Sequence, residues 1–255
     1  MTAKIAAAIA SVCVALSSAG CLSFYEIPVE IPIQAKIDVT SFQRVLVAGF
    51  LTGGTKGIDP NTETARLLRS QLRSKQDLRV LDADVISLVD EVDRARGGAP
   101  AEAAAAQTTE PRIQTDKDLE SYKAIFANTE FWKKLGAEYD QPLIVTGSVM
   151  FTEVTRSGMV SRPRSTVNAQ GVEQYESVRE YADMKGFALS PTFVFIDGRT
   201  GAQLYTESYH EETLYPAGQN TPALSSYFEL MDKLLPSFLN TLSTQKIRGT
   251  RVLLK

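Results

Sequence analysis

A glycine-rich loop after a short apolar run contains residue types that bind phosphate. Gly49 and Gly54 are spaced like the two glycines of a phosphate-binding loop, and a helix is predicted to follow. Such a loop needs a lysine directly after the second glycine, so that the lysine and backbone N–H groups meet the phosphate together. Here the order is Thr55-Lys56, and the first helix-capping residue is Asp59. The sequence therefore argues against a nucleotide site.

Other groups that could do chemistry lack the partners they would need. His210 is the single histidine, so no histidine-rich metal site can form, and no nucleophile motif completes a triad. Asp82 and Asp84 could chelate a cation, but capping a helix is the commoner role of such residues. Glu211 and Glu212 are consecutive, so on a strand they face opposite sides and cannot act as a carboxylate pair. We therefore expect no enzyme activity, no cofactor and no metal.

Three arginines of a predicted helix form a candidate partner-binding face. Arg66, Arg69 and Arg73 have i, i+3 and i+7 spacing, which places them on one side of the helix. A solvated face is the usual meaning of such a pattern. The alternative is a contact surface for an acidic partner or for a neighbouring subunit.

The first twenty residues have the pattern of a cleaved secretory signal. Lys4 supplies a short positive region, residues 5–16 form an uncharged apolar run, and small residues at 17–20 lead to Cys21. An apolar run of this length is too short to span a bilayer as a permanent helix. We therefore expect residues 1–20 to be removed on export.

The position of Cys21 indicates a lipid anchor. The small residues directly before it resemble the lipobox of bacterial lipoproteins, in which the cysteine is acylated and becomes the new N-terminus. Ser18 stands where leucine is usual, and ordinary signal-peptidase cleavage after Ala19 is the alternative. Because Cys13 leaves with the signal, acylation explains why an exported protein keeps one unpaired cysteine. Cys21 is thus the candidate lipidation site, and membrane lipid is an expected partner.

Composition and length limit the remaining possibilities. The formal net charge is −3, and a weakly acidic protein has no electrostatic reason to bind nucleic acid. No other apolar run reaches the roughly eighteen residues of a membrane span. The length of the mature chain fits one domain better than two. We expect a lipidated, extended tether at 21–41 and a single α/β domain at 42–255.

Hydrophobic periodicity predicts the elements of this domain. Alternating apolar residues at 24–39 predict an extended arm, which Pro28 and Pro32 restrict to an edge position. The predicted strands are 44–50, 78–81, 142–154, 192–196, 202–215 and 246–254, and the predicted helices are 59–75, 119–127, 130–139 and 222–242. Asp82 or Asp84 is expected to cap a short helix that ends near Val92. The segments 94–118 and 157–173 are predicted to be mobile loops because their composition provides little apolar surface to bury.

Three segments, taken in order, resemble a superfamily of periplasmic lipoproteins. They are the strand at 44–50, the segment 142–149 (PLIVTGSV) and the turn at 195–201 (FIDGRTG). The superfamily includes the curli-secretion lipoprotein, the lipoprotein activators of penicillin-binding proteins and the amino-terminal domain of TolB. The resemblance covers about residues 42–245. It implies a three-layer α/β sandwich, with amphipathic helices on a mixed, largely antiparallel sheet, and a role in envelope assembly by protein–protein contact.

Two functions remain open at this point. The first is a non-catalytic accessory or regulatory lipoprotein that binds an envelope protein, with its domain facing the periplasm. Leu22 lacks the aspartate that favours inner-membrane retention, so the outer membrane is expected by analogy. The alternative is a self-associating subunit of an outer-membrane secretion pore of the curli type, to which each copy lends β-hairpins. Charged residues throughout 152–185 leave no clean apolar face there, which argues against the pore.

Overall fold

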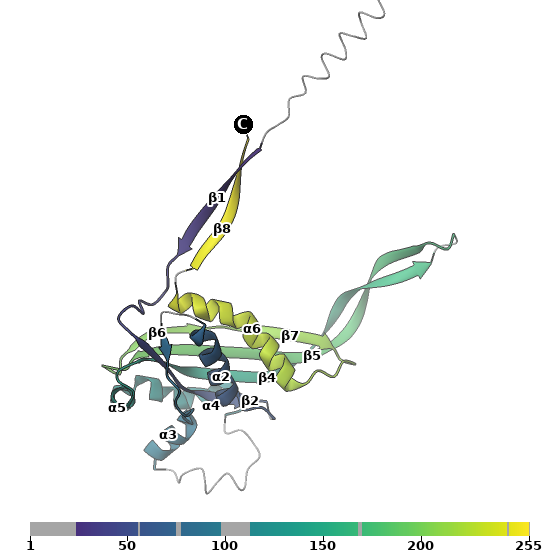
Figure 1. Cartoon of the computed structure of the whole chain (residues 1–255). Helices are drawn as coiled ribbons and strands as arrows, with labels where there is room; N and C mark the ends of the chain where they lie inside the picture. Colours follow the sequence, from purple (N-terminus) through teal and green to yellow (C-terminus); the bar gives the residue numbers. More distant parts are fainter. Residues whose placement is uncertain are drawn as a thin grey trace, which may run out of the picture. The chain divides into compact units, whose positions relative to one another are not determined.

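The chain divides into two compact units in a computed structural model that describes residues 24–55, 57–74, 78–97, 113–167, 170–243 and 245–254 (Figure 1). We call Lys36–Ser243 the body. The terminal ribbon is the strand pair β1 (Phe24–Ile33) and β8 (Gln245–Leu254). The expected signal at 1–20 and the candidate lipidation site Cys21 lie outside the described residues.

The terminal ribbon differs from the predicted tether and domain limits. β1 pairs with β8 in antiparallel register, from Phe24 opposite Leu254 to Ile33 opposite Gln245. The expected tether therefore contains a paired strand, and the last strand predicted for the α/β domain belongs to another unit. Periodicity identifies both strands, but it carries no information on which strands pair when more than two hundred residues separate them.

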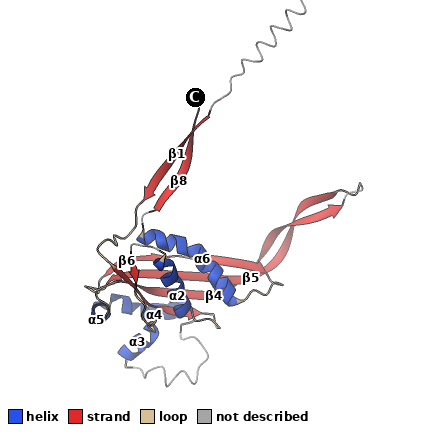
Figure 2. Ribbon diagram, viewed as in Figure 1, coloured by secondary structure: helices blue, strands red, loops and turns tan. Residues whose placement is uncertain are grey.

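One mixed sheet forms the centre of the body (Figure 2). Its strands are β2 (Arg44–Gly54), β3 (Arg79–Val80), β4 (Leu143–Val167), β5 (Glu173–Asp197), β6 (Gln203–Ser208) and β7 (Glu211–Pro216). The order is β3-β2-β4-β5-β6, and β7 pairs with a separate stretch of β5. β2 is parallel to β3 and β4, whereas every pairing of β5 is antiparallel. The mixed, largely antiparallel sheet is thus confirmed.

Helices cover both faces of this sheet and make three layers (Figure 2). On one face α2 (Pro60–Arg73) and α6 (Ala223–Leu242) share a core with Val45 and Val47 of β2. The other face is covered by α3 (Leu88–Ala95), α4 (Asp116–Tyr122), η2 (Lys123–Ala127) and α5 (Thr129–Glu138). Leu46 of the same strand belongs to this second core, because successive strand residues face opposite sides. The α/β sandwich predicted from the sequence is confirmed.

The start of α2 follows directly from the sequence. The Asp59 side chain accepts a hydrogen bond from the Asn61 N–H at 3.1 Å, and Pro60 occupies the first turn. Leu68 and Leu72, one turn apart, are buried against the sheet. This helix therefore has the cap and the apolar face that the sequence predicts.

The predicted cap of the next helix is wrong. α3 begins after Ser87, and neither Asp82 nor Asp84 lies at its start. Asp82 forms an ion pair with Arg73 of α2 instead. The residues between β3 and α3 form neither helix nor strand, so the helix starts later than the position of the aspartates suggests.

The first predicted loop, 94–118, is shorter than expected. α3 continues to Ala95, and α4 starts at Asp116 because Thr115 and Asp118 form a capping box. Each of these two side chains accepts a hydrogen bond from the main-chain N–H of the other residue. Residues 98–112 lie outside the described residues.

The prediction of a mobile loop at 157–173 is wrong, because most of this segment is β-strand. Residues 157–167 continue β4 and pair with residues 173–183 of β5, from Ser157 opposite Asp183 to Val167 opposite Glu173. The polar composition that predicted a loop belongs to strands whose two faces both meet solvent. Hydrogen bonds between the two main chains stabilise such a hairpin without a buried apolar face.

Candidate interaction surface

The hairpin arm, residues 157–167 of β4 and 173–183 of β5, extends past the strands that flank it in the body (Figure 1). β2 pairs with β4 as far as Phe151, and β7 pairs with β5 as far as Met184. Beyond these points β4 and β5 pair only with each other among the described strands. At about 3.4 Å per residue, each strand of the arm is about 35 Å long. The arm therefore offers two faces and two unpaired edges to a partner.

Exposed large apolar side chains lie at separate levels of one face of the arm, between polar residues. Met159 lies opposite Tyr181, and Ser165 lies opposite Tyr175, so these positions share a face. The exposed fractions are 64% for Met159, 69% for Tyr181 and 75% for Tyr175. Val167, at the end of the same face, is also exposed. The two pairs are six residues, or about 20 Å, apart, and Arg179 is among the residues between them on this face. The face therefore offers separate apolar contact points to a partner rather than one continuous patch.

Charge is divided between the two strands of the arm. The β4 strand carries Arg162 and Arg164 and no acidic residue, for a formal charge of +2. The β5 strand has a formal charge of −3, from Glu173, Glu176, Arg179, Glu180 and Asp183. One pair, Arg162 with Glu180 at 3.0 Å, joins the strands within the arm. One edge of the arm is therefore basic and the other acidic.

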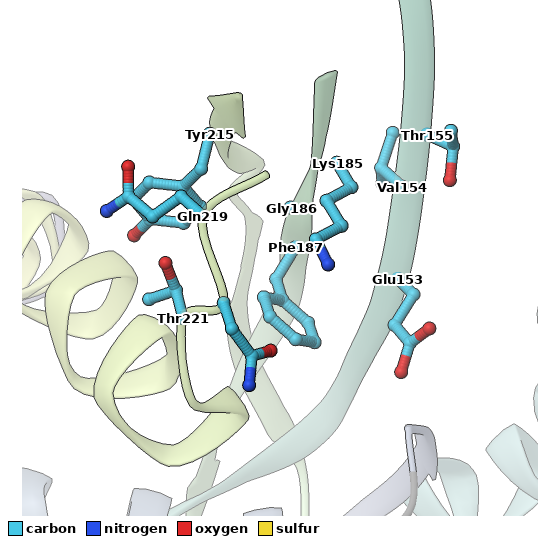
Figure 3. A pocket seen from close by; sticks show the side chains of 10 residues that line it. Glu153, Val154, Thr155, Lys185, Gly186, Phe187, Tyr215, Gln219 and Thr221 are labelled. Atoms are coloured by element: carbon cyan, nitrogen blue, oxygen red, sulfur yellow. The ribbon is translucent and has the colours of Figure 1, made fainter. Parts of the chain in front are cut away.

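A polar hollow lies at the base of the arm (Figure 3). It has a volume of about 270 Å³ and lies between β4, β5, β7 and the loop that leads into α6. Glu153 and Lys185 bring opposite charges, and Gln219 brings a carboxamide. The buried hydroxyl oxygen of Thr221 has no hydrogen-bond partner among the described atoms. The hollow can therefore accept polar groups of a partner that contacts the arm.

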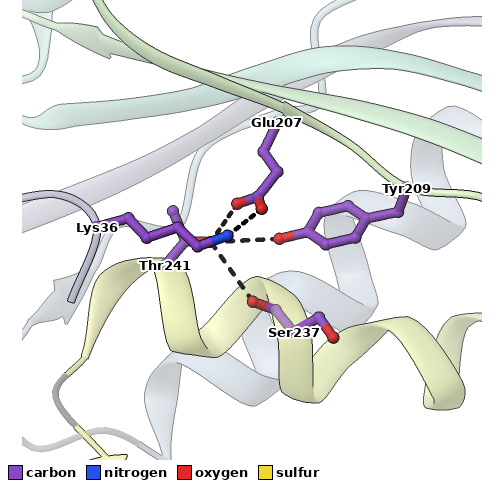
Figure 4. A network of polar contacts seen from close by, with 5 residues as sticks. All are labelled: Lys36, Glu207, Tyr209, Ser237 and Thr241. Carbon is purple, nitrogen blue, oxygen red and sulfur yellow. Dashed lines mark hydrogen bonds and ion pairs between the residues drawn. The ribbon is translucent and has the colours of Figure 1, made fainter. Parts of the chain in front are cut away.

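A polar network fastens the start of the body to the end of α6 (Figure 4). Lys36 forms an ion pair with Glu207, which also accepts a hydrogen bond of 2.9 Å from the Thr241 hydroxyl. The Lys36 main-chain N–H donates to the Thr241 carbonyl at 3.1 Å, and the Tyr209 hydroxyl lies 3.2 Å from that of Thr241. The polar groups of the four side chains contact one another, which indicates that the network stabilises the fold.

Ionisation of this network follows from its contacts. The hydrogen bond with Glu207 raises the pKa of Lys36. Burial acts to raise the pKa of Glu207, but the hydrogen bonds from Lys36, Thr241 and Tyr209 outweigh burial and lower it. Burial raises the pKa of Tyr209 to about 12. At neutral pH the network therefore holds a charged pair and a neutral phenol.

Two of the three candidate arginines are exposed on α2 and contact acidic neighbours. Arg66 lies 2.9 Å from the Glu63 carboxylate, and Arg73 forms an ion pair with Asp82. Pairs of this kind on a surface contribute about 0–1 kcal/mol and leave the arginines accessible. The structure therefore places Arg66 and Arg73 where a partner can reach them, and their role in binding stays a prediction.

Arg69 has a different environment from the other two. It is half-buried, and its guanidinium donates a hydrogen bond of 2.8 Å to the Val47 carbonyl of β2. Burial lowers the pKa of Arg69. The register of β2 against β4 shifts between Val47 and Gly49, where a β-bulge disrupts the regular ladder. Arg69 thus satisfies a carbonyl at an irregular point of the sheet.

The glycines of the phosphate-loop-like segment allow close packing of the main chain. Gly49 and Gly54 both lie in β2. A Cβ atom at Gly49 would lie 2.1 Å from the Ile86 carbonyl oxygen, and one at Gly54 would lie 1.9 Å from that of Phe151. Both positions therefore need glycine for reasons of space, which explains the glycine spacing without a phosphate.

The remaining candidate groups are part of the surface. The His210 Nδ1 atom lies 2.8 Å from the Ser190 hydroxyl, and Glu212 binds Arg156 at 2.6 Å. Within the described residues no group of three or more histidine, cysteine, aspartate or glutamate side chains could hold a metal ion. Across the same residues, no helix has the length and apolar character required to cross a membrane.

Among known proteins, the chain is similar to several solved structures. No protein-family model matches the chain, and no curated protein matches its sequence. A PelC dodecamer from Paraburkholderia phytofirmans is 12% identical, with a TM-score of 0.37, covering 88% of this chain and 100% of that chain. A putative neuraminyllactose-binding hemagglutinin homolog from Helicobacter pylori is 8% identical, with a TM-score of 0.39, covering 82% of this chain and 87% of that chain.

A third similar structure is lipoprotein GNA1162 from Neisseria meningitidis. It is 13% identical, with a TM-score of 0.27, and the similarity covers 77% of this chain and 98% of that chain. Similarity at these TM-scores assigns no family and carries no argument about function. The superfamily inferred from sequence stays a prediction, and the function below is argued from the residues of this chain.

Proposed function

We propose that this protein is a non-catalytic lipoprotein of the bacterial outer membrane, anchored through Cys21 with its body in the periplasm, and that it binds an envelope protein through the hairpin arm. The observation that carries the proposal is the row of exposed apolar side chains on one face of the arm, Met159, Tyr175 and Tyr181. The residues before Cys21 support the anchor, and the lack of aspartate at Leu22 supports the outer membrane.

Energetics favour a partner for the arm. An isolated two-stranded hairpin is marginally stable in water, and ordering its residues costs conformational entropy. A partner that covers the apolar face contributes about 25 cal/mol for each Å² of apolar surface removed from water. Tyrosine and methionine are enriched at protein interfaces for this reason. Binding would therefore stabilise the arm by covering apolar side chains that the body leaves exposed.

The anchor is tested by the intact mass of the mature N-terminus and by membrane fractionation of Cys21→Ala. We expect a diacyl or triacyl mass on Cys21 and release of the variant into the soluble fraction. An unmodified N-terminus near residue 20, with the variant fractionating like wild type, would remove the anchor from the proposal.

Contact through the arm is tested by site-specific photocrosslinking in intact cells. A photoreactive amino acid replaces Tyr175 or Tyr181, and Asp232, exposed on α6, is the matched control position. We expect both arm positions to crosslink the same envelope protein and the control position to give no such product. Absence of crosslinks at both arm positions, with normal protein levels, would contradict binding through this face.

A second candidate is the self-associating subunit, and the charge division of the arm favours it. When arms of two copies point the same way, the acidic β5 edge of one lies beside the basic β4 edge of the next, and these strands run antiparallel. Such a head-to-tail contact is heterologous and closes into a ring where the rotation permits. Opposite charges across the contact would set its register.

Charge reversal distinguishes the two candidates. The variants are Arg162→Glu/Arg164→Glu and Glu176→Arg/Glu180→Arg, each examined by sedimentation in detergent. If copies associate through the arm, each variant alone is monomeric and a chain with both strands reversed assembles again, because pairing within and between arms is restored. A wild-type chain that sediments as a monomer would reject the second candidate and leave the first standing.

A further inference from the structure

The end of the terminal ribbon nearest to Cys21 consists of apolar residue types on both strands. Phe24 lies opposite Leu254, and Tyr25 lies opposite Leu253. These four positions are the first two of β1 and the last two of β8. The pairing therefore brings residues from opposite ends of the sequence together within a few residues of the candidate lipidation site.

Chain geometry limits how far this end can lie from a lipid on Cys21. Only Leu22 and Ser23 separate Cys21 from β1. An extended chain spans at most about 3.6 Å per residue, so the Cα atoms of Cys21 and Phe24 are at most about 11 Å apart. Paired strands lie about 5 Å apart, so β8 ends at nearly the same height as β1 begins. Each interfacial layer of a bilayer is about 5–8 Å thick.

We propose that this end of the ribbon contacts the interfacial layer of the bilayer, so that the ribbon stands end-on with a lipid contact in addition to the acyl chains. The proposal rests on lipidation of Cys21, which belongs to the proposed function. Phenylalanine and tyrosine are residue types that favour the membrane interface, and leucine favours its apolar side. Directly opposite pairs of these types stabilise a strand end in water, and a strand end at the interface gains in addition from removal of their apolar surface from water.

Within β1 and β8 the charged residues stand farther along the ribbon, and Lys255 follows Leu254 in the sequence. Arg251, three positions from the end of β8, is exposed at about 10 Å from that end, which is the level of lipid headgroups. Glu26 lies at a similar level on β1, so the two charges balance. Lys255 adds a salt-dependent attraction to anionic lipid, whereas the apolar contact does not depend on salt, so the contact is expected to persist at high salt.

The experiment uses the lipidated full-length protein with one fluorescent label. Cys13 leaves with the signal and the Cys21 thiol is consumed by the lipid, so Leu254→Cys supplies the one free thiol for an environment-sensitive dye. The matched control is Ile31→Cys, an exposed position of β1 seven residues, or about 23 Å, from Phe24. Both proteins are reconstituted in phosphatidylethanolamine–phosphatidylglycerol vesicles with and without brominated acyl chains. Circular dichroism checks that each variant folds like wild type.

We expect brominated lipid to quench the dye at position 254 and to leave the dye at position 31 unchanged, at low and at high salt. Equal quenching at both positions, or no quenching at position 254 in a protein whose mass shows an acylated Cys21, overturns the proposal and leaves the lipoprotein function standing. An unmodified Cys21 would instead react with the dye and show a lower mass, which identifies failure of the proposed function itself.

Discussion

Arg69 and Arg66 lie one turn apart on α2, but we expect only Arg69 to contribute strongly to the free energy of unfolding. Arg69→Ala removes the guanidinium that donates a hydrogen bond to the Val47 carbonyl at a bulge of β2. Loss of a hydrogen bond from a charged group costs about 1–3 kcal/mol, and we expect the free energy of unfolding to fall by that amount. Urea denaturation followed by circular dichroism measures the change.

Arg66→Ala is the matched control for this prediction. Its side chain is exposed and contacts the Glu63 carboxylate and, at 5.8 Å, the Phe228 ring, so we expect the free energy of unfolding to fall by about 1 kcal/mol or less. Equal destabilisation by both substitutions would contradict the structural role assigned to Arg69. An effect of Arg66→Ala on crosslinking, without one on stability, would support the arginine face as a binding site.

At the residue scale, local signals in the sequence predict local features. Asp59-Pro60 predicts the start of α2, because the cap and the first turn involve neighbouring residues. The spacing of the three arginines predicts a common side of the helix, but it cannot show that Arg69 reaches a carbonyl of β2. That contact depends on the bulge at Val47 and on the packing of α2 against the sheet, which are tertiary features.

The hairpin arm is an element that the body does not need for its own core. We expect replacement of residues 158–182 by Asn-Gly to leave the melting temperature of the body unchanged, because Asn-Gly forms a two-residue turn between Ser157 and Asp183. The described residues among those removed are exposed or half-buried, and none belongs to either core. Differential scanning calorimetry measures the melting temperature.

The matched control removes a side chain of the body at the same sheet. Phe193→Ala replaces a buried ring of β5 that packs on Phe238 of α6 at 4.8 Å between ring centroids. Such substitutions cost about 3–5 kcal/mol, so the melting temperature should fall clearly. A comparable fall on shortening the arm would show that the arm stabilises the body, against the prediction.

At the element scale, the sequence predicts strands and helices that pack on a core and misses those that do not. The segment 142–154 is predicted as a strand because it is rich in apolar residues, and these are buried in both cores. The continuation of β4 through 157–167 has no apolar alternation, since neither face is covered. Main-chain pairing with β5 stabilises it, and pairing between distant strands leaves little trace in composition.

The whole molecule should lose stability in strong alkali through the half-buried phenol of Tyr209. The pKa of Tyr209 is about 12 in the folded chain, against an ordinary value of 10. A raised pKa contributes stability that is fully present below pH 10 and is lost as the pH rises through 12, because the unfolded chain releases the proton first. We expect Tyr209→Phe to lessen the fall in stability between pH 10 and 12.

Urea unfolding midpoints measured across this pH range test the prediction. Tyr209→Phe also removes a contact with Thr241, which can lower stability at every pH. Each variant is therefore compared with its own midpoint at about pH 8, and the quantity compared is the change of the midpoint with pH. Tyr175→Phe, at an exposed position of the arm, is the matched control and should keep the wild-type slope. An unchanged slope in Tyr209→Phe would contradict the role of this phenol.

If the chain is exported as proposed, the pairing of β1 with β8 imposes an order on the events that follow. In such an export β1 would cross the membrane early and β8 only after the whole body, so β1 would have no β8 to pair with until then. An unpaired strand invites pairing with other chains. Pro28 and Pro32 lack N–H donors, and Glu26 and Glu30 carry like charges, so β1 is a poor template for such pairing. For a chain exported as proposed, we therefore expect the composition of β1 to limit aggregation until β8 has crossed as well.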